Sequence, residues 1–169
     1  MHVDGVTVEG IHDIRAAVFN HFSSHFKTIG PDRPGVENLH FRKLSGVQAE
    51  DLTKPFSREE VKQAVWDCDS FKSPGPDDIN FAFIKQFWDL LQDDFMRFLV
   101  EFHRNGKLIK GINSIFIALI PKVNSPLQLN DFRPISLVGC LYKVLAKVLA
   151  NHLSLVVGCV VSESQSTFI

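Results

Sequence analysis

The sequence predicts an α-rich α+β fold in which helices surround a small antiparallel hairpin or sheet. Apolar residues recur at three- and four-residue steps in several segments, which is the period of an amphipathic helix. One β-branched apolar run, residues 114–120, ends at Pro121 and is followed by a shorter extended segment, a pattern typical of a hairpin. With 169 residues, 45% of them hydrophobic and 22% charged, the chain is long enough and apolar enough for one domain with a core.

The first helix is predicted near the N-terminus, where apolar residues follow helical spacing at Ile11, Ile14, Val18, Phe22 and Phe26. A Gly-Pro-Asp-Arg-Pro-Gly sequence at residues 30–35 forms turns and ends this helical pattern. Because residues 36–54 show no clear periodicity, we interpret residues 28–55 as a linker. The chain is therefore expected to divide into a helical lead-in with linker, 1–55, and a main domain, 56–169.

A second helix is predicted to begin at Ser57, which forms a capping box with Glu60; its buried stripe is Val61, Ala64, Val65 and Cys68. Residues 72–78, Lys-Ser-Pro-Gly-Pro-Asp-Asp, predict a tight, stiff loop because proline removes a donor and restricts the residue before it. Residues 81–91 are again helical in pattern. The apolar residues of 95–102 either continue that helix or start another, which ends near Asn105 and Gly106.

The predicted hairpin occupies the next part of the chain. Its first strand covers residues 114–120, an Asn-Ser-Pro turn follows at 124–126, and residues 132–137 form the extended return. A helix is predicted over residues 140–153, and the valine pairs at 156–157 and 160–161 are ambiguous between helix and strand.

Charge is unevenly placed along the chain. Residues 104–153 hold seven Lys/Arg and one acid, giving 7 − 1 = +6, although the net charge of the protein is −1. Residues 50–101 hold six bases and twelve acids, giving 6 − 12 = −6. The basic block is typical of a surface that faces a polyanion, and attraction between the two oppositely charged halves is the alternative.

Three cysteines without a Cys-x-x-Cys spacing argue against a disulfide framework and a structural zinc site, and they favour a reducing compartment. The N-terminus lacks the basic and apolar regions of a secretory signal. No apolar run approaches the roughly 20 residues that span a bilayer. We therefore expect an intracellular protein, in cytoplasm or nucleus, with no membrane contact.

Three stretches in this order resemble one family: Phe-Lys-Ser-Pro-Gly-Pro-Asp at 71–77, Ala-Leu-Ile-Pro-Lys at 118–122 leading to Phe-Arg-Pro-Ile-Ser-Leu at 132–137, and Ser-Glu-Ser-Gln-Ser-Thr-Phe-Ile at 162–169. They resemble the N-terminal, fingers part of the reverse transcriptase of non-LTR (LINE-type) retrotransposons, in the style common in plants. The resemblance implies a fingers-like subdomain of an incomplete polymerase fold over 56–169. In the family a Gly commonly follows the Asp of the first stretch, whereas this chain has Asp78.

The resemblance implies roles for several residues. Lys122 and Arg133 are the candidates for binding the triphosphate of an incoming nucleotide, a role that suits the point charge of Lys and the bidentate fork of Arg. The candidates for contact with the RNA or DNA template-primer are Lys72, Lys143, Lys147 and Gln165. Phe168 lies in the same stretch as Gln165. Two exposed cations and a solvated lysine face remain the alternatives for the hairpin and for the last helix.

Catalysis in this family uses metal ions held by carboxylates, one set on a Tyr-x-Asp-Asp hairpin. The single tyrosine, Tyr142, is followed by Lys-Val-Leu, and no acidic pair of the chain sits on an apolar strand. We expect no catalytic residue, metal site or cofactor in this fragment, Mg²⁺ belonging to the full-length enzyme with its palm region. The sequence thus predicts a catalytically incomplete fragment of an RNA-directed DNA polymerase. The alternatives are a non-catalytic nucleic-acid-binding module and a non-functional relic.

Overall fold

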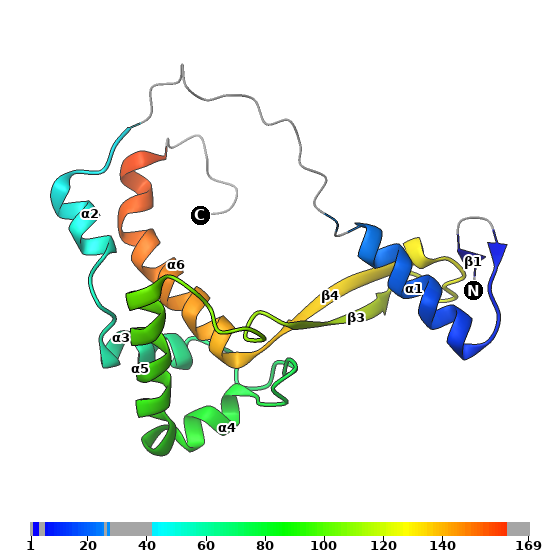
Figure 1. Cartoon of the computed structure of the whole chain (residues 1–169), viewed down its shortest axis with the longest axis horizontal. Helices are drawn as coiled ribbons and strands as arrows, with labels where there is room; N and C mark the ends of the chain where they lie inside the picture. The colour runs from blue at the N-terminus through cyan, green and yellow to red at the C-terminus, as the bar shows by residue number, and fades with distance from the viewer. Residues whose placement is uncertain (1, 4–5, 26, 28–41, 162–169) are drawn as a thin grey trace. The chain divides into compact units, whose positions relative to one another are not determined.

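The structure is a computed structural model that describes residues 2–3, 6–25, 27 and 42–161. Its elements follow in the order β1, β2, α1, α2, α3, α4, α5, β3, β4 and α6, as Figure 1 shows. They form two compact units, one made of residues 1–39 with 117–136 and the other of residues 40–116 with 137–169. The division runs through the β3–β4 hairpin, whereas the sequence suggests a boundary near residue 55.

The first unit joins the N-terminal elements to the outer part of the hairpin. β1 (His2–Val3) and β2 (Val6–Thr7) pair in antiparallel orientation, and the His2 N–H donates to the Leu127 carbonyl at 2.7 Å. α1 (Ile11–His25) confirms the first predicted helix. Phe22 of its predicted apolar stripe is buried, and Phe26 lies outside the described residues.

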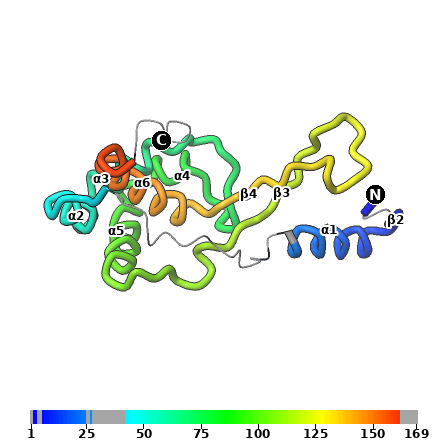
Figure 2. The backbone as a smooth tube through the Cα atoms, turned by 90° about the horizontal axis from the view of Figure 1, so that it is seen from above, coloured from blue at the N-terminus to red at the C-terminus, as the bar shows by residue number. Residues whose placement is uncertain are grey.

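β3 (Ile115–Pro121) and β4 (Phe132–Val138) form the predicted two-stranded sheet and lie side by side in both views (Figures 1 and 2). A 3₁₀ turn, Leu129–Asp131, leads into β4. Phe116 and Ile120 of β3 are 54% and 50% exposed, so little of the sheet is covered in this chain. Because a two-stranded sheet is marginal by itself, the hairpin depends on the contacts at its ends.

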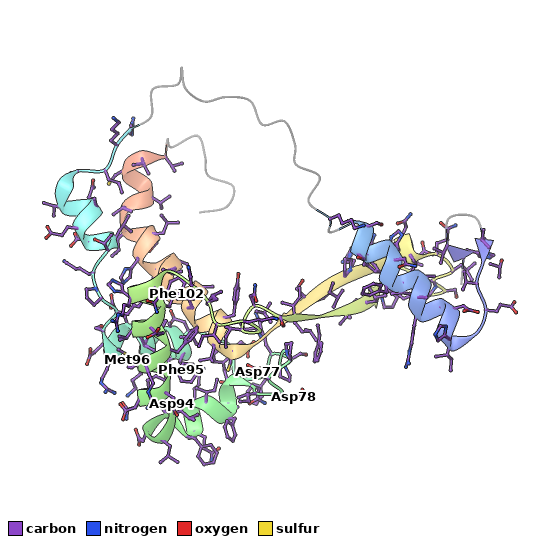
Figure 3. The ribbon with its side chains drawn as sticks, viewed as in Figure 1. Asp77, Asp78, Asp94, Phe95, Met96 and Phe102 are labelled. Carbon is purple, nitrogen blue, oxygen red and sulfur yellow. The ribbon has the colours of Figure 1, made fainter. Side chains whose placement is uncertain are left out.

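The second unit has its core between α3 (Arg58–Trp66), α5 (Trp88–Asn105) and α6 (Cys140–Val160). The predicted capping box is confirmed: the Glu60 N–H donates to Ser57 Oγ at 3.2 Å, and the Ser57 N–H donates to Glu60 Oε2 at 2.7 Å. Glu60 also contacts α6, where its Oε1 lies 3.0 Å from Nε2 of the buried His152. Figure 3 labels Phe95, Met96 and Phe102 along α5; Phe95 is buried in the core, and the other two pack against it.

Residues 81–105 form two helices, one of the two possibilities that their helical pattern allows. α4 (Phe81–Gln86) starts at Asn80, whose side-chain oxygen accepts the Phe83 N–H at 3.0 Å. Phe87 then leaves helical geometry with φ −104° and ψ 23°, and α5 follows. α5 ends as predicted at Gly106, which has φ +64° and donates its N–H to the Phe102 carbonyl.

The interpretation of residues 28–55 as a linker is wrong for its described part, because α2 (Gly46–Leu52) lies there. Ser45 caps this helix in a capping box whose third residue is Gln48. A helix of seven residues is too short to show helical periodicity, and none of its side chains is buried. α2 packs against α6, where Gln48 Nε2 lies 3.0 Å from Cys159 Sγ. Residues 28–41 lie outside the described part of the chain.

α6 is longer than the predicted helix over 140–153, because the ambiguous valines continue it to Val160. Val156 is buried at 3% exposure, so packing decides the conformation of this β-branched segment. By length and composition alone α6 could also cross a membrane. That is weak evidence, because Val144, Leu145 and Val148 of the same helix lie in the core cluster with residues of α3.

The predicted stiff loop is fixed against the junction between β4 and α6. A β-carbon added to Gly75 would lie 2.3 Å from the carbonyl carbon of Val138 and 2.4 Å from the Gly139 nitrogen, so only glycine fits this contact. Asp77 Oδ2 accepts the Cys140 N–H, the first free donor of α6, at 2.5 Å. Figure 3 shows Asp77 and its neighbour Asp78 in this loop. One loop therefore holds a strand end and a helix start that lie over 60 residues later in the chain.

The same loop contains a residue in left-handed geometry. The Asp78 N–H donates to the Gly75 carbonyl at 3.1 Å and closes a turn around Pro76. Asp78 has φ +53°, the only positive φ of a non-glycine residue in the described chain. This is the position where the resembling family commonly has Gly, a residue that adopts positive φ without a steric penalty.

Replacing Asp78 by Gly should stabilise the protein. Because the β-carbon at positive φ is removed, we expect Asp78→Gly to raise the free energy of unfolding by about 0.5–1 kcal/mol. Asp78→Ala is the control: it removes the carboxylate and keeps the β-carbon, so it should not stabilise. Urea unfolding followed by circular dichroism measures both. A Gly variant no more stable than the Ala variant would contradict the strain at this position.

Removing the Asp77 carboxylate should weaken the start of α6. Burial acts to raise the pKa of Asp77, but hydrogen bonds from Cys140 and Ile79 outweigh it and hold this pKa below the ordinary 3.8. A carboxyl whose pKa is depressed by folding stabilises the protein above its unfolded pKa, and this contribution is lost as the pH falls through the folded pKa. We expect Asp77→Ala to cost about 1 kcal/mol at pH 7, the usual worth of a helix cap.

The pH dependence provides the control for this expectation. The stability difference between the parent protein and Asp77→Ala should shrink as unfolding is measured at successively lower pH below about 4, since protonated Asp77 no longer favours the folded state. Asp94→Ala removes a carboxylate whose sole partner among the described residues is Arg97, in an exposed pair, so its effect should stay within about 0.5 kcal/mol. An Asp77→Ala variant as stable as Asp94→Ala at pH 7 would show that the contact with Cys140 contributes nothing.

Candidate functional site

The hairpin brings Lys122 and Arg133 to the same end of the two strands. Lys122 directly follows β3, and Arg133 is the second residue of β4. The Lys122 N–H donates to the Asp131 carbonyl at 2.7 Å, which places the two chain segments opposite each other at this end. Both side chains are exposed. The spatial part of the sequence prediction, two cations at one end of a hairpin, therefore agrees with the structure.

Lys122 has a structural role in addition to its charge. Its Nζ donates to the Asn130 carbonyl at 2.9 Å and so ties the strand end to the turn before β4. Asp131 stabilises the same turn from inside, where its Oδ2 accepts the Gln128 N–H at 2.9 Å and the Leu127 N–H at 3.0 Å. These backbone bonds, with a smaller contribution from the Lys122 charge, lower the pKa of Asp131. The carboxylate is thus ionised at neutral pH beside the Lys122 ammonium.

Arg133 differs from Lys122 in its bonding. The described part of the chain contains no hydrogen bond or ion pair of the Arg133 side chain. Its guanidinium is therefore free to accept an anion from solution, in the bidentate geometry that arginine offers to phosphate. Of the two hairpin cations, Arg133 can bind phosphate without breaking a contact within the described chain.

The other candidate lysines belong to the second unit and differ in availability. Lys147 Nζ lies 3.5 Å from Asp67 Oδ2, and Lys143 Nζ donates to the Ser73 carbonyl at 3.4 Å. Both side chains are half-buried along α6. Lys72 is exposed in the loop before Pro74 and makes no hydrogen bond or ion pair within the described residues. Lys72 is therefore the most available of these three for a nucleic-acid phosphate.

Two other predicted contacts lie outside the described residues. Gln165, a candidate for template contact, and Phe168 both fall in residues 162–169. Their predicted role stays a prediction.

Three carboxylates of the acidic pairs in the sequence have structural partners. Asp77 caps α6, and Asp93 on α5 lies 2.7 Å from Arg58 of α3. Asp94 pairs with Arg97 one helical turn further along α5. In the residues that the structure describes, no three His, Cys, Asp or Glu side chains gather closely enough to hold a metal ion.

Sequence reasoning missed three side chains that shape the candidate site. Asp131 appears in the sequence as the single acid of the basic block, although an Asp ahead of a strand commonly bonds nearby backbone N–H groups and signals a turn. Asp77 bonds to a residue 63 positions away, so no local signal points to it. Lys85 donates to the carbonyls of Trp66 and Cys68 and to Ser70 Oγ, a long-range contact that only the structure reveals.

Comparison with known proteins relates the chain to a transposon-encoded protein. No protein-family model matches the chain. Over 123 residues, or 73% of its length, the chain is 33% identical to the uncharacterised 149 kDa protein of transposon TX1 from Xenopus laevis. The match covers 9% of that protein, so the chain spans less than a tenth of the relative's length. This similarity relates the chain to transposon-encoded proteins.

Proposed function

We propose that this chain is the fingers part of the reverse transcriptase of a non-LTR retrotransposon, of the type common in plants, and that it binds phosphate groups of nucleotide and nucleic acid. The observation that carries the proposal is that Lys122 and Arg133 both lie at one end of the β3–β4 hairpin. The similarity to a transposon protein supports the retrotransposon origin. The order of the three sequence stretches supports the assignment to the fingers region.

The proposed binding step uses the two cations differently. Arg133 makes a bidentate contact to the triphosphate of an incoming nucleotide, because its guanidinium is not engaged elsewhere in the described chain. Lys122 supplies a second positive charge while its Nζ also stabilises the turn through Asn130. Asp131 keeps that turn in place and reduces the net charge at the hairpin end. This arrangement favours a polyanion held by charge over a neutral ligand held by shape.

Template and primer contact is assigned to lysines of the second unit. Lys72 makes the contact most readily, whereas Lys143 and Lys147 must exchange their present partners for a phosphate. Such contacts carry no sequence information and depend on salt. The proposal gives the chain no nucleotidyl-transfer step of its own, because its sequence contains no Tyr-x-Asp-Asp word and because Asp77, Asp93 and Asp94 are each bonded to another residue.

Nucleotide titration followed by NMR tests the proposal. Addition of a deoxynucleoside triphosphate should shift backbone amide resonances of residues 120–133, and the uncharged deoxynucleoside should not. Arg133→Ala should weaken the response at least several-fold without loss of folding, since the side chain makes no bond within the described residues. Lys122→Ala should weaken it as well, and should also destabilise the turn because the bond to Asn130 is lost.

Arg97→Ala is the matched control. It removes the same charge from an exposed position on α5, and the nucleotide response should stay at the level of the parent protein. Equal responses to triphosphate and nucleoside, or an Arg133→Ala variant that responds like Arg97→Ala, would overturn the proposal.

A further inference from the structure

Phe71 projects from the second unit with 90% of its surface exposed. Burying a phenylalanine side chain is worth roughly 1.5–3 kcal/mol, and this chain forgoes that gain at a position next to an exposed lysine, Lys72. A single exposed apolar side chain is ordinary by itself, so the bonding of the backbone around Phe71 decides whether this one is informative. The loop that carries Phe71 is held firmly on both sides.

Before Phe71, the chain is fixed by Lys85. Its half-buried ammonium donates to the Trp66 carbonyl at 3.1 Å, to the Cys68 carbonyl at 2.7 Å and to Ser70 Oγ at 3.1 Å. A lysine ammonium has three N–H donors, and Lys85 directs all three at acceptors in this one loop. The Ser70 carbonyl also accepts the Ala82 N–H at 3.2 Å, which ties the loop to the first turn of α4.

At and after Phe71, further bonds set the direction of the chain. The Phe71 N–H donates to Asp69 Oδ1 at 3.0 Å, the bond of an Asx-turn. The Ser73 carbonyl accepts from Lys143 of α6, and Gly75 packs against Val138 and Gly139. The backbone on either side of Phe71 is therefore preorganised, while the ring itself meets solvent.

Among the charged residues of the segment 67–78, one cation is available to a ligand. Asp67 is paired with Lys147, Asp69 is bonded to the Phe71 N–H, and Asp77 is bonded to the start of α6. Asp78 remains exposed at the far end of the loop. Lys72, the residue next to the ring, has no partner within the described chain. A preorganised aromatic face beside a free ammonium is the combination that proteins use to bind single-stranded nucleic acid.

We infer that Phe71 is a stacking platform for an unpaired nucleobase, with Lys72 on the adjoining phosphate. The ligand class is a single strand of RNA or DNA, because a base within a duplex offers no free face to the ring. The inference rests on the proposed function in that nucleic acid is the ligand, but it concerns a residue and a unit separate from Lys122 and Arg133.

Binding of a 20-nucleotide single-stranded RNA, measured by fluorescence anisotropy at several salt concentrations, tests this role. Base–aromatic stacking contributes about 1–3 kcal/mol per base, so Phe71→Ala should weaken binding by about tenfold or more. Stacking releases no counterion, so the salt dependence should be unchanged. Lys72→Ala should instead reduce the slope of log affinity against log salt by about 0.7, the value for one phosphate contact on a single strand.

Two further variants separate stacking from apolar contact. Phe71→Trp should bind at least as tightly as the parent protein, and its added tryptophan emission should be quenched by the RNA, measured as the difference from the parent protein with its native tryptophans. Phe71→Leu should bind as weakly as Phe71→Ala. Phe19→Ala is the control, since Phe19 is also strongly exposed (70%) but lies on α1 without this setting, and it should bind normally.

Several results would overturn the inference. Full binding by Phe71→Leu would indicate a generic apolar contact, such as a protein partner makes. The platform would be excluded if Phe71→Ala bound RNA as tightly as the parent protein, or if Phe19→Ala lost as much affinity. It would also be excluded if the parent protein bound no single-stranded RNA. None of these results affects the triphosphate response of the hairpin, which depends on Arg133. Loss of the Phe71 effect alone therefore overturns the stacking platform and leaves the triphosphate proposal standing, whereas a parent protein that binds no RNA would also remove the template contact assigned to Lys72.

Discussion

The close contact between Gly75 and the Val138–Gly139 backbone is the constraint on which the second unit depends. It joins a loop before α4 to the point where β4 ends and α6 begins, and it admits no side chain at residue 75. Asp77 adds a polar bond to the first turn of α6, and the Cys140 thiol is buried beside it with its pKa raised to about 12 by that burial and by the Asp77 carboxylate. Phe71 and Lys72 lie shortly before Gly75 in the same loop, so the direction of the backbone that carries them depends on this contact.

Local sequence signals predicted most of the elements, and tertiary contacts explain the rest. The capping box at Ser57 and Glu60 and the glycine end at Gly106 are local devices, and both occur as predicted. α2 was missed because seven residues with no buried side chain leave no periodic pattern. The end of α6 was placed too early because valine favours strands, whereas burial of Val156 against the rest of the unit favours the helix here.

In the candidate site too, the sequence predicts local geometry but not tertiary contacts. The sequence order of Lys122 and Arg133 around a turn was enough to predict that they share one end of a hairpin. It could not show that Lys122 bonds to Asn130 or that Lys147 pairs with Asp67, because these contacts depend on where the backbone brings each partner. The structure thus ranks the candidates by availability: Arg133 and Lys72 are free within the described chain, whereas Lys122, Lys143 and Lys147 are each bonded to another residue.

Comparing Gly75→Ala with Gly46→Ala tests the central contact most directly. A β-carbon at Gly46 would meet no atom within 4 Å at the start of α2, so Gly46→Ala should be neutral or stabilise by up to about 1 kcal/mol. Gly75→Ala forces its β-carbon into backbone atoms of Val138 and Gly139 and should lower the free energy of unfolding by about 2 kcal/mol or more. Urea unfolding of both variants provides the measurement. Equal stability of the two alanine variants would contradict the account that the loop and the β4–α6 junction are locked together at residue 75.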